Sequence, residues 1–135
     1  MDLDRALSIS AAGMAAQSAR LRVVAENIAN RDSTGQSPGA EPYRRKTVTF
    51  ASRMDRELGA ETVRVSQVGR DQREFPERFE PGHPAADGRG YVRTPNVDSM
   101  VENMDMREAN RSYSANLAVL ETTRGMLMRA IETLR

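Results

Sequence analysis

The last third of the chain, residues 96–134, constrains the fold most, because it contains no proline and keeps one spacing over many turns. From Met106 onward, apolar residues recur at alternating steps of four and three, which is the spacing of a coiled-coil seam. The seam positions are Met106, Asn110, Tyr113, Leu117, Leu120, Arg124, Leu127, Ile131 and Leu134. All but Asn110 and Arg124 are apolar or aromatic. The pattern predicts one long helix that packs against another helix.

This helix is predicted to begin near Asp98 or Ser99. Ser99 and Glu102 have the spacing of a capping box, and Asp98 is an alternative cap. The first apolar residues lie in a different phase from the seam, so the helix is expected to present two faces in succession, first to the middle of the chain and then to another helix. These first residues are Val97, Met100, Val101 and Met104.

Residues 3 to about 30 carry a second helical pattern, in which Leu7, Met14, Leu21 and Ile28 recur every seven residues and Leu3 and Val24 fill the intermediate phase. Gly13 lies inside this helix, where glycine costs about 1 kcal/mol relative to alanine. It shares a row of small residues with Ala6 and Ser10. Two explanations remain open: a tolerated weak position, or a close approach by another helix.

The middle of the chain is predicted to be a loop followed by a small β-containing insert. Residues 31–42 are rich in turn-forming residues, and residues 43–50 have the composition of a strand. A second strand is expected around Val63 and Val65, and a short third one at Tyr91 and Val92. Prolines and glycines make residues 72–90 an irregular, partly extended connection. Most aromatic residues lie between 40 and 95, so the compact core is expected there.

Together these patterns predict a mainly α fold with a small β-containing insert. The long N- and C-terminal helices would pair as an antiparallel, coiled-coil-like hairpin. The predicted segments are an N-terminal helix at 1–30, the loop and insert at 31–95, and a C-terminal helix at 96–135 that completes the helical core domain.

Composition excludes several classes of function. The formal charge is +1 and no segment has the basic excess of a nucleic-acid-binding surface. Arg44-Arg45-Lys46 is therefore predicted to be a solvated strand end and not a nucleic-acid patch. The absence of Cys removes disulfides and thiol catalysis. No apolar run approaches the roughly 18 residues that a membrane span needs. Asp2 and Asp4 do not fit a cleaved signal peptide.

No pattern of catalytic or ligand-binding residues emerges. The single histidine, His83, lies in Pro81-Gly82-His83-Pro84, where a loop role is expected. Asp87-Gly88-x-Gly90 lacks the ligand ladder of a calcium loop and the context of a dinucleotide fingerprint. We therefore predict no enzyme activity, no cofactor and no metal.

Apolar residues also lie off the two seams, at Val23, Val119, Met126, Met128 and Ala130. The chain has no other large apolar surface to cover them. Self-association, or assembly with similar chains, is the expected consequence.

Several motifs resemble the flagellar rod and hook family of axial proteins. The opening Leu7-Ser8-Ile9-Ser10-Ala11-Ala12-Gly13-Met14-Ala15-Ala16-Gln17 with Asn27-Ile28-Ala29-Asn30 is similar to the N-terminal signature of this family. Four further stretches together resemble the proximal-rod members of this family. They are Pro81-Gly82-His83-Pro84, Gly90-Tyr91-Val92, Pro95-Asn96-Val97-Asp98 and Ala109-Asn110-Arg111-Ser112-Tyr113-Ser114-Ala115-Asn116. Between residues 31 and 42 the chain departs from the family, with Asp32-Ser33-Thr34-Gly35 and a proline-rich extension in place of a Thr-Thr-Gly-like turn.

The resemblance implies a structural subunit of the rod that crosses the periplasm, exported by the flagellar type III apparatus without a cleaved signal. Its terminal helices would contact each other and neighbouring rod subunits, with no membrane insertion. We predict that Leu117, Leu120, Leu127 and Ile131 meet the N-terminal helix of the same chain, while Val119 and Met126 meet other subunits. The alternative is a cytoplasmic coiled-coil adaptor or export chaperone that binds partner helices.

Overall fold

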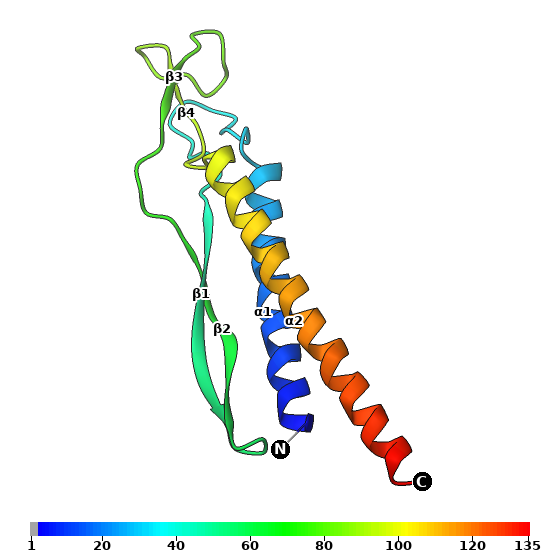
Figure 1. Cartoon of the computed structure of the whole chain (residues 1–135). Helices are drawn as coiled ribbons and strands as arrows, with labels where there is room; N and C mark the ends of the chain where they lie inside the picture. Colours follow the sequence, from blue (N-terminus) through cyan, green and yellow to red (C-terminus); the bar gives the residue numbers. More distant parts are fainter. Residues whose placement is uncertain (1–2) are drawn as a thin grey trace. The chain divides into compact units, whose positions relative to one another are not determined.

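The computed structural model describes residues 3–135. These residues form two long helices and four strands in the order α1 (Leu3–Ala29), β1 (Lys46–Asp55), β2 (Ala60–Arg70), β3 (Glu77–Phe79), β4 (Tyr91–Arg93) and α2 (Ser99–Thr133) (Figure 1). β1 pairs with β2, and β3 with β4, as two separate two-stranded sheets. The prediction of two long terminal helices around a small β-containing insert is confirmed. Within the described residues, neither helix has the length and apolar content to span a membrane.

The chain divides into two compact units, and both helices contribute to each. Unit 1 contains the described residues up to Leu21, together with Val48–Gln67 and Arg107–Arg135. Unit 2 contains Arg22–Thr47 and Val68–Met106. This division differs from the sequence segments predicted above, because each unit combines helix and strand residues.

Both helix ends in unit 2 have defined caps. α1 ends where the Asn30 amide group donates to the carbonyl of Glu26 at 2.9 Å and its side-chain oxygen accepts from the Ser33 hydroxyl at 3.0 Å. α2 is preceded by Asp98, whose Oδ1 accepts from the Met100 N–H at 3.0 Å. Of the two caps that the sequence offered, Asp98 therefore fills the role.

In unit 1, a turn at residues 56–59 joins β1 to β2. Asp55 Oδ1 accepts from the N–H groups of Glu57 and Leu58 at 3.0 and 3.3 Å, and Gly59 has a φ of 63°. The Thr62 hydroxyl donates to the carbonyl of Arg53, and the Ser66 hydroxyl to that of Thr49. The strands therefore run antiparallel. They are also longer than predicted, because the first strand continues past Phe50 to Asp55.

In unit 2, the predicted short strand at Tyr91 has a partner that the sequence did not indicate. β3 pairs antiparallel with β4 in the register Glu77↔Arg93, Arg78↔Val92 and Phe79↔Tyr91. The Phe79 and Tyr91 rings meet edge to face at 5.3 Å between centroids. Residues 77–79 lie inside the stretch predicted as an irregular connection, where prolines and glycines obscured the short extended segment.

Of the aromatic residues expected in a compact core of the middle region, Tyr43, Phe50 and Phe75 are half-buried, but two others lie at the surface. Phe79 is 63% exposed, and Tyr91 is also exposed. The buried apolar residues in this part of unit 2 are small, namely Ala85 and Val92. Polar side chains, namely Asn27, Asn96 and Glu102, fill another part of the buried space in unit 2.

Gly90→Ala is expected to loosen the β3–β4 pair. Gly90 has a φ of 84°, and a Cβ there would lie 2.9 Å from Phe79 Cε2 and 3.1 Å from Pro81 Cγ. The left-handed conformation alone costs alanine roughly 1–2 kcal/mol. Faster amide exchange at Glu80, which donates to the Gly90 carbonyl at 2.9 Å, measures the effect. Gly88→Ala is the control, because a Cβ at Gly88 meets nothing within 4 Å and its φ is not strained. Equal exchange in both variants would contradict the prediction.

Candidate functional site

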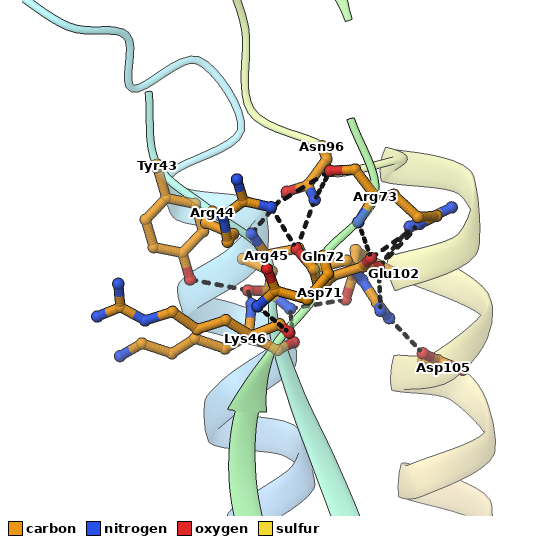
Figure 2. Close-up of polar contacts among 12 residues, drawn as sticks. Tyr43, Arg44, Arg45, Lys46, Asp71, Gln72, Arg73, Asn96, Glu102 and Asp105 are labelled. Atoms are coloured by element: carbon orange, nitrogen blue, oxygen red, sulfur yellow. Dashed lines mark hydrogen bonds and ion pairs between the residues drawn. The ribbon is translucent and has the colours of Figure 1, made fainter. Parts of the chain in front are cut away.

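The centre of unit 2 is a buried ion pair. The Glu102 side chain is 0% exposed, and its Oε1 accepts a hydrogen bond from Arg45 Nε (Figure 2). α2 supplies Glu102, and Arg45 lies directly before β1. A buried carboxylate is costly unless it is paired and hydrogen-bonded. Arg45 therefore fixes the position of the α2 start.

Arg45 is shared among three carboxylates. Its Nη1 lies 3.4 Å from Asp71 Oδ2, and its Nη2 lies 3.5 Å from Asp105 Oδ2. Burial alone lowers the pKa of Arg45, but the hydrogen bond and the charge of Glu102 outweigh it, so the pKa is raised. Asp71 and Asp105 add to this effect. The guanidinium thus stays charged and joins two segments of unit 2 to α2.

Asn27, which is only 1% exposed, ties α1 to the same cluster. Its amide nitrogen donates to the Lys46 carbonyl at 2.9 Å and to Glu102 Oε2 at 3.4 Å. Its oxygen accepts from the Lys46 N–H at 2.9 Å and from the Tyr43 hydroxyl at 2.8 Å. The side chain therefore pairs with the Lys46 backbone as a neighbouring strand would. Burial raises the pKa of Tyr43, and Glu26 and Glu102 raise it further.

Asn96, which lies just before α2, also binds backbone groups through its side chain. Its oxygen accepts from the Arg45 N–H at 2.8 Å, and its nitrogen donates to the carbonyls of Asp71 and Arg73 at 3.0 and 3.2 Å. Figure 2 shows these bonds converging above the ion pair. Asn27 and Asn96 thus satisfy backbone groups that have no partner strand at this position.

Asp71 completes the cluster on the side of the chain that leaves β2. Arg73 Nη2 lies 2.8 Å from Asp71 Oδ2, and the hydrogen bond from Arg73 lowers the pKa of Asp71 to about 2. The Asp71 N–H also donates to the Arg45 carbonyl at 2.8 Å. We call Asn27, Arg45, Asp71, Asn96 and Glu102 the polar core of unit 2.

The polar core corrects one prediction about charge. Arg45 was expected at a solvated strand end, but only 17% of its side chain is exposed and it is ion-paired. Every carboxylate of the polar core faces a guanidinium. The Asn27 side chain makes four hydrogen bonds and that of Asn96 makes three. The arrangement suits a clamp that holds several segments together, and it offers no nucleophile or base to a substrate.

The first two turns of α2 also differ from the prediction. Met100, Val101 and Met104 were expected to face the middle of the chain, but Met100 is 73% and Met104 64% exposed, and Val101 is exposed too. Glu102 occupies the inward position instead. An apolar helix face left in solvent, opposite a polar buried one, is typical of a surface that meets a partner.

In unit 1 the helices meet through small and polar residues. A Cβ on Gly13 would lie 2.9 Å from Asn116 Nδ2. Further along, Arg20 Nη2 is 3.7 Å from Glu108 Oε2. Later residues of α1 thus meet earlier residues of α2. Of the two explanations for Gly13, the close approach of another helix is correct.

We call the residues of a helix that face the other helix its inward stripe. The inward stripe differs from the predicted seam at alternate positions, where the residue just before the seam residue faces inward in its place. On α2, Ala109 and Thr123 are buried and Asn116 is half-buried, whereas Asn110, Leu117 and Arg124 are exposed. On α1, Gly13 and Asn27 are buried, whereas Met14 and Ile28 are half-buried. Large apolar side chains are therefore displaced to the flanks of the contact.

Gly13→Leu is expected to destabilise unit 1 by about 1–3 kcal/mol, because the side chain overpacks the contact with Asn116. Gly13→Ala should be close to neutral, since the Asn116 side chain can rotate and alanine favours helix. Gly125→Leu is the matched control in α2, where the nearest atom to a Cβ is Arg129 Nη2 at 3.7 Å. Thermal unfolding followed by circular dichroism compares them. A Gly13→Leu variant as stable as the control would contradict the close approach.

Comparison with known proteins identifies the family. The model of the flagella basal body rod proteins matches residues 7–35, and that of the C-terminal part of the flagellar basal body rod FlgEFG proteins matches residues 89–133. The flagellar basal-body rod protein FlgC of Agrobacterium fabrum is 51% identical over 133 residues, covering 98% of this chain and 96% of the relative. This chain belongs to the FlgC family.

Other FlgC proteins match at similar coverage. That of Yersinia enterocolitica is 42% identical over 135 residues, covering 97% of both chains. That of Bacillus subtilis is 36% identical over 141 residues, covering 93% of this chain and 94% of the relative. These relatives are named as rod proteins, and the family is structural and not enzymatic.

The motif residues of this FlgC-family chain have structural tasks. Asn27 and Asn96 belong to the polar core, Asn30 ends α1, and Asn116 contacts Gly13. Pro95 is buried and Val97 half-buried.

The residues predicted for helix pairing and assembly fall into three groups. Gly13 and Val24 are buried. Half-buried residues are Leu3, Leu7, Met14, Leu21, Ile28, Met106, Tyr113, Leu120 and Leu127. Exposed ones are Leu117, Val119, Met126, Ile131 and Leu134. Val23, expected to need an external partner, is buried within the chain.

Sequence reasoning missed the charged residues of the polar core, namely Arg45, Asp71 and Glu102, and the hydrogen bond from Tyr43 to Asn27. One weak signal for Glu102 existed: its capping-box spacing from Ser99, which placed it in the first turn of the helix but did not indicate that it is buried. For Asp71 the sequence holds no comparable signal, since its role depends on the pairing of β1 with β2, which places the residue after β2 opposite the residue before β1.

Proposed function

We propose that this chain is a structural subunit of the proximal rod of the bacterial flagellar basal body, the drive shaft that transmits torque. Membership of the FlgC family carries the proposal. The exposed apolar residues of the helices support it, because a subunit that assembles must keep such faces for its neighbours. Val119 is 51% and Met128 52% exposed.

Within this function, the terminal helices at 1–30 and 96–135 form the helical core domain, and residues 31–95 form the insert. We infer that the helices pair antiparallel in a coiled-coil-like manner. The contacts of Gly13 with Asn116 and of Arg20 with Glu108 support this pairing in unit 1. Small residues on the contact allow a close spacing, which leaves the larger Leu and Met side chains free to meet other subunits.

The partners proposed are other copies of this chain and other rod proteins, in the part of the flagellum that spans the periplasm. The flagellar type III export apparatus would deliver the chain without cleavage of a signal. Torque would be carried by many equivalent helix contacts, a task that needs no cofactor and no catalytic residue.

The alternative is an export chaperone or adaptor in the cytoplasm. A rod subunit is expected to have terminal regions that open easily as a monomer, because their partner surfaces are absent. Limited proteolysis of the purified full chain should therefore cut within the first 30 and last 35 residues before the polar core region around Arg45. Equal resistance of the ends and the middle would favour a preformed adaptor.

A further inference from the structure

The described residues of unit 1 leave a hollow between them. It has a volume of about 340 Å³ and lies between α1 and β2, lined by Ala12, Ala15, Ala16, Val63, Arg64 and Val65. The alanines make one wall shallow and the two valines make the other wall apolar. We call it the alanine hollow. Its walls match large apolar side chains presented by a helix.

The same unit carries such side chains on α2. Leu117, Met128 and Ile131 are 36%, 52% and 46% exposed. Spacings of 11 and three residues place them on one face of the helix. This face, called the α2 flank here, directly adjoins the half-buried positions Leu120 and Leu127, so it continues the existing helix contact outward.

Charges on the two surfaces are complementary. The alanine hollow has Arg64, and Asp55 lies 3.8 Å from its Nη2. The α2 flank has Glu121 and Arg124, both exposed and on the same face as Leu117. One docking can therefore pair Glu121 with Arg64 and Arg124 with Asp55.

From these observations we propose that the α2 flank of one copy docks into the alanine hollow of a second copy, with Met128 as the side chain that enters. The two surfaces are different, so the contact is heterologous and can repeat from copy to copy. This rests on the proposed function and specifies the surfaces through which copies of the subunit meet.

Disulfide crosslinking tests the contact cleanly, because the chain has no native Cys. Differently tagged Ala15→Cys and Met128→Cys copies are produced together in flagellated cells that lack the unsubstituted chain. Basal bodies are isolated and oxidised. We expect a crosslinked pair containing both tags. Arg129→Cys replaces Met128→Cys in the control, since residue 129 is exposed but points about 100° away around the helix.

Further variants test the hollow without a crosslink. Ala15→Trp fills it and should reduce incorporation into basal bodies, while Ser18→Trp, which is exposed outside the hollow, should not. In solution, Met128→Ala should weaken self-association about tenfold, equivalent to about 1.4 kcal/mol.

Three outcomes separate the claims. A crosslink through Met128→Cys but not Arg129→Cys supports the contact. Incorporation of both cysteine variants with no crosslink, or with equal crosslinking in the control, overturns the contact and leaves the rod assignment intact. Absence of even the unsubstituted chain from basal bodies overturns the rod assignment, and the contact with it.

Discussion

Arg45→Met is expected to destabilise unit 2 by about 3–5 kcal/mol, because it leaves the Glu102 carboxylate buried without its guanidinium. The remaining hydrogen bond to Glu102, from Asn27 at 3.4 Å, is too long to compensate. Asp71 and Asp105 also lose a neighbouring positive charge. Denaturant unfolding monitored by circular dichroism, with amide exchange at Lys46 as the local probe, measures the loss.

Two comparisons make this prediction specific. Arg78→Met breaks the exposed pair with Glu80 in the same unit, 2.9 Å apart, and should cost less than about 1 kcal/mol. The double variant Arg45→Met with Glu102→Leu removes both buried charges and should recover most of the stability. Equal losses for Arg45→Met and Arg78→Met would show that the polar core does not hold unit 2 together.

Leu120→Asp is expected to abolish assembly into rods while unit 2 stays folded. Leu120 is half-buried in the inward stripe of α2, beside the exposed Leu117. A carboxylate there places a charge where helix packing excludes water, which is strongly unfavourable. The measurement is the amount of the variant in isolated basal bodies, with swimming as the functional readout.

The control for Leu120→Asp is Ala118→Asp, which adds the same charge to an exposed position two residues away on α2. Amide exchange at Lys46, inside unit 2, checks that the polar core remains intact in both variants. Normal incorporation of Leu120→Asp into rods would overturn the proposed role of the helix seam.

The sequence predicted the helices well because their signals are local. Periodicity located α1 and α2 within a few residues, and the row of small residues around Gly13 left a close approach as one of two explanations. Apolar periodicity alone did not define the inward stripe, since Ala109, Asn116 and Thr123 occupy it while Leu117 does not. The helices are close enough that side-chain size, and not hydrophobicity, decides which residues fit between them.

The polar core could not be predicted because it depends on distant segments. Arg45 and Glu102 are separated by 57 positions, and Asn27 and Glu102 by 75. Each residue alone is typical of a solvated surface. The chain reversal between β1 and β2 brings Asp71 back to Arg45 and so contributes to the buried cluster. Without that contact, Arg44-Arg45-Lys46 resembles any charged strand end.

The most direct test of the central claim is the location of the chain in flagellated cells. Basal bodies are purified and a tagged copy of the full chain is located by electron-microscopic density and by crosslinking from the exposed α2 residues Val119 and Met126. We predict density in the rod and crosslinks to other copies or other rod proteins. A chain found only in the cytoplasm, crosslinked to export substrates and absent from the rod, would contradict the assignment.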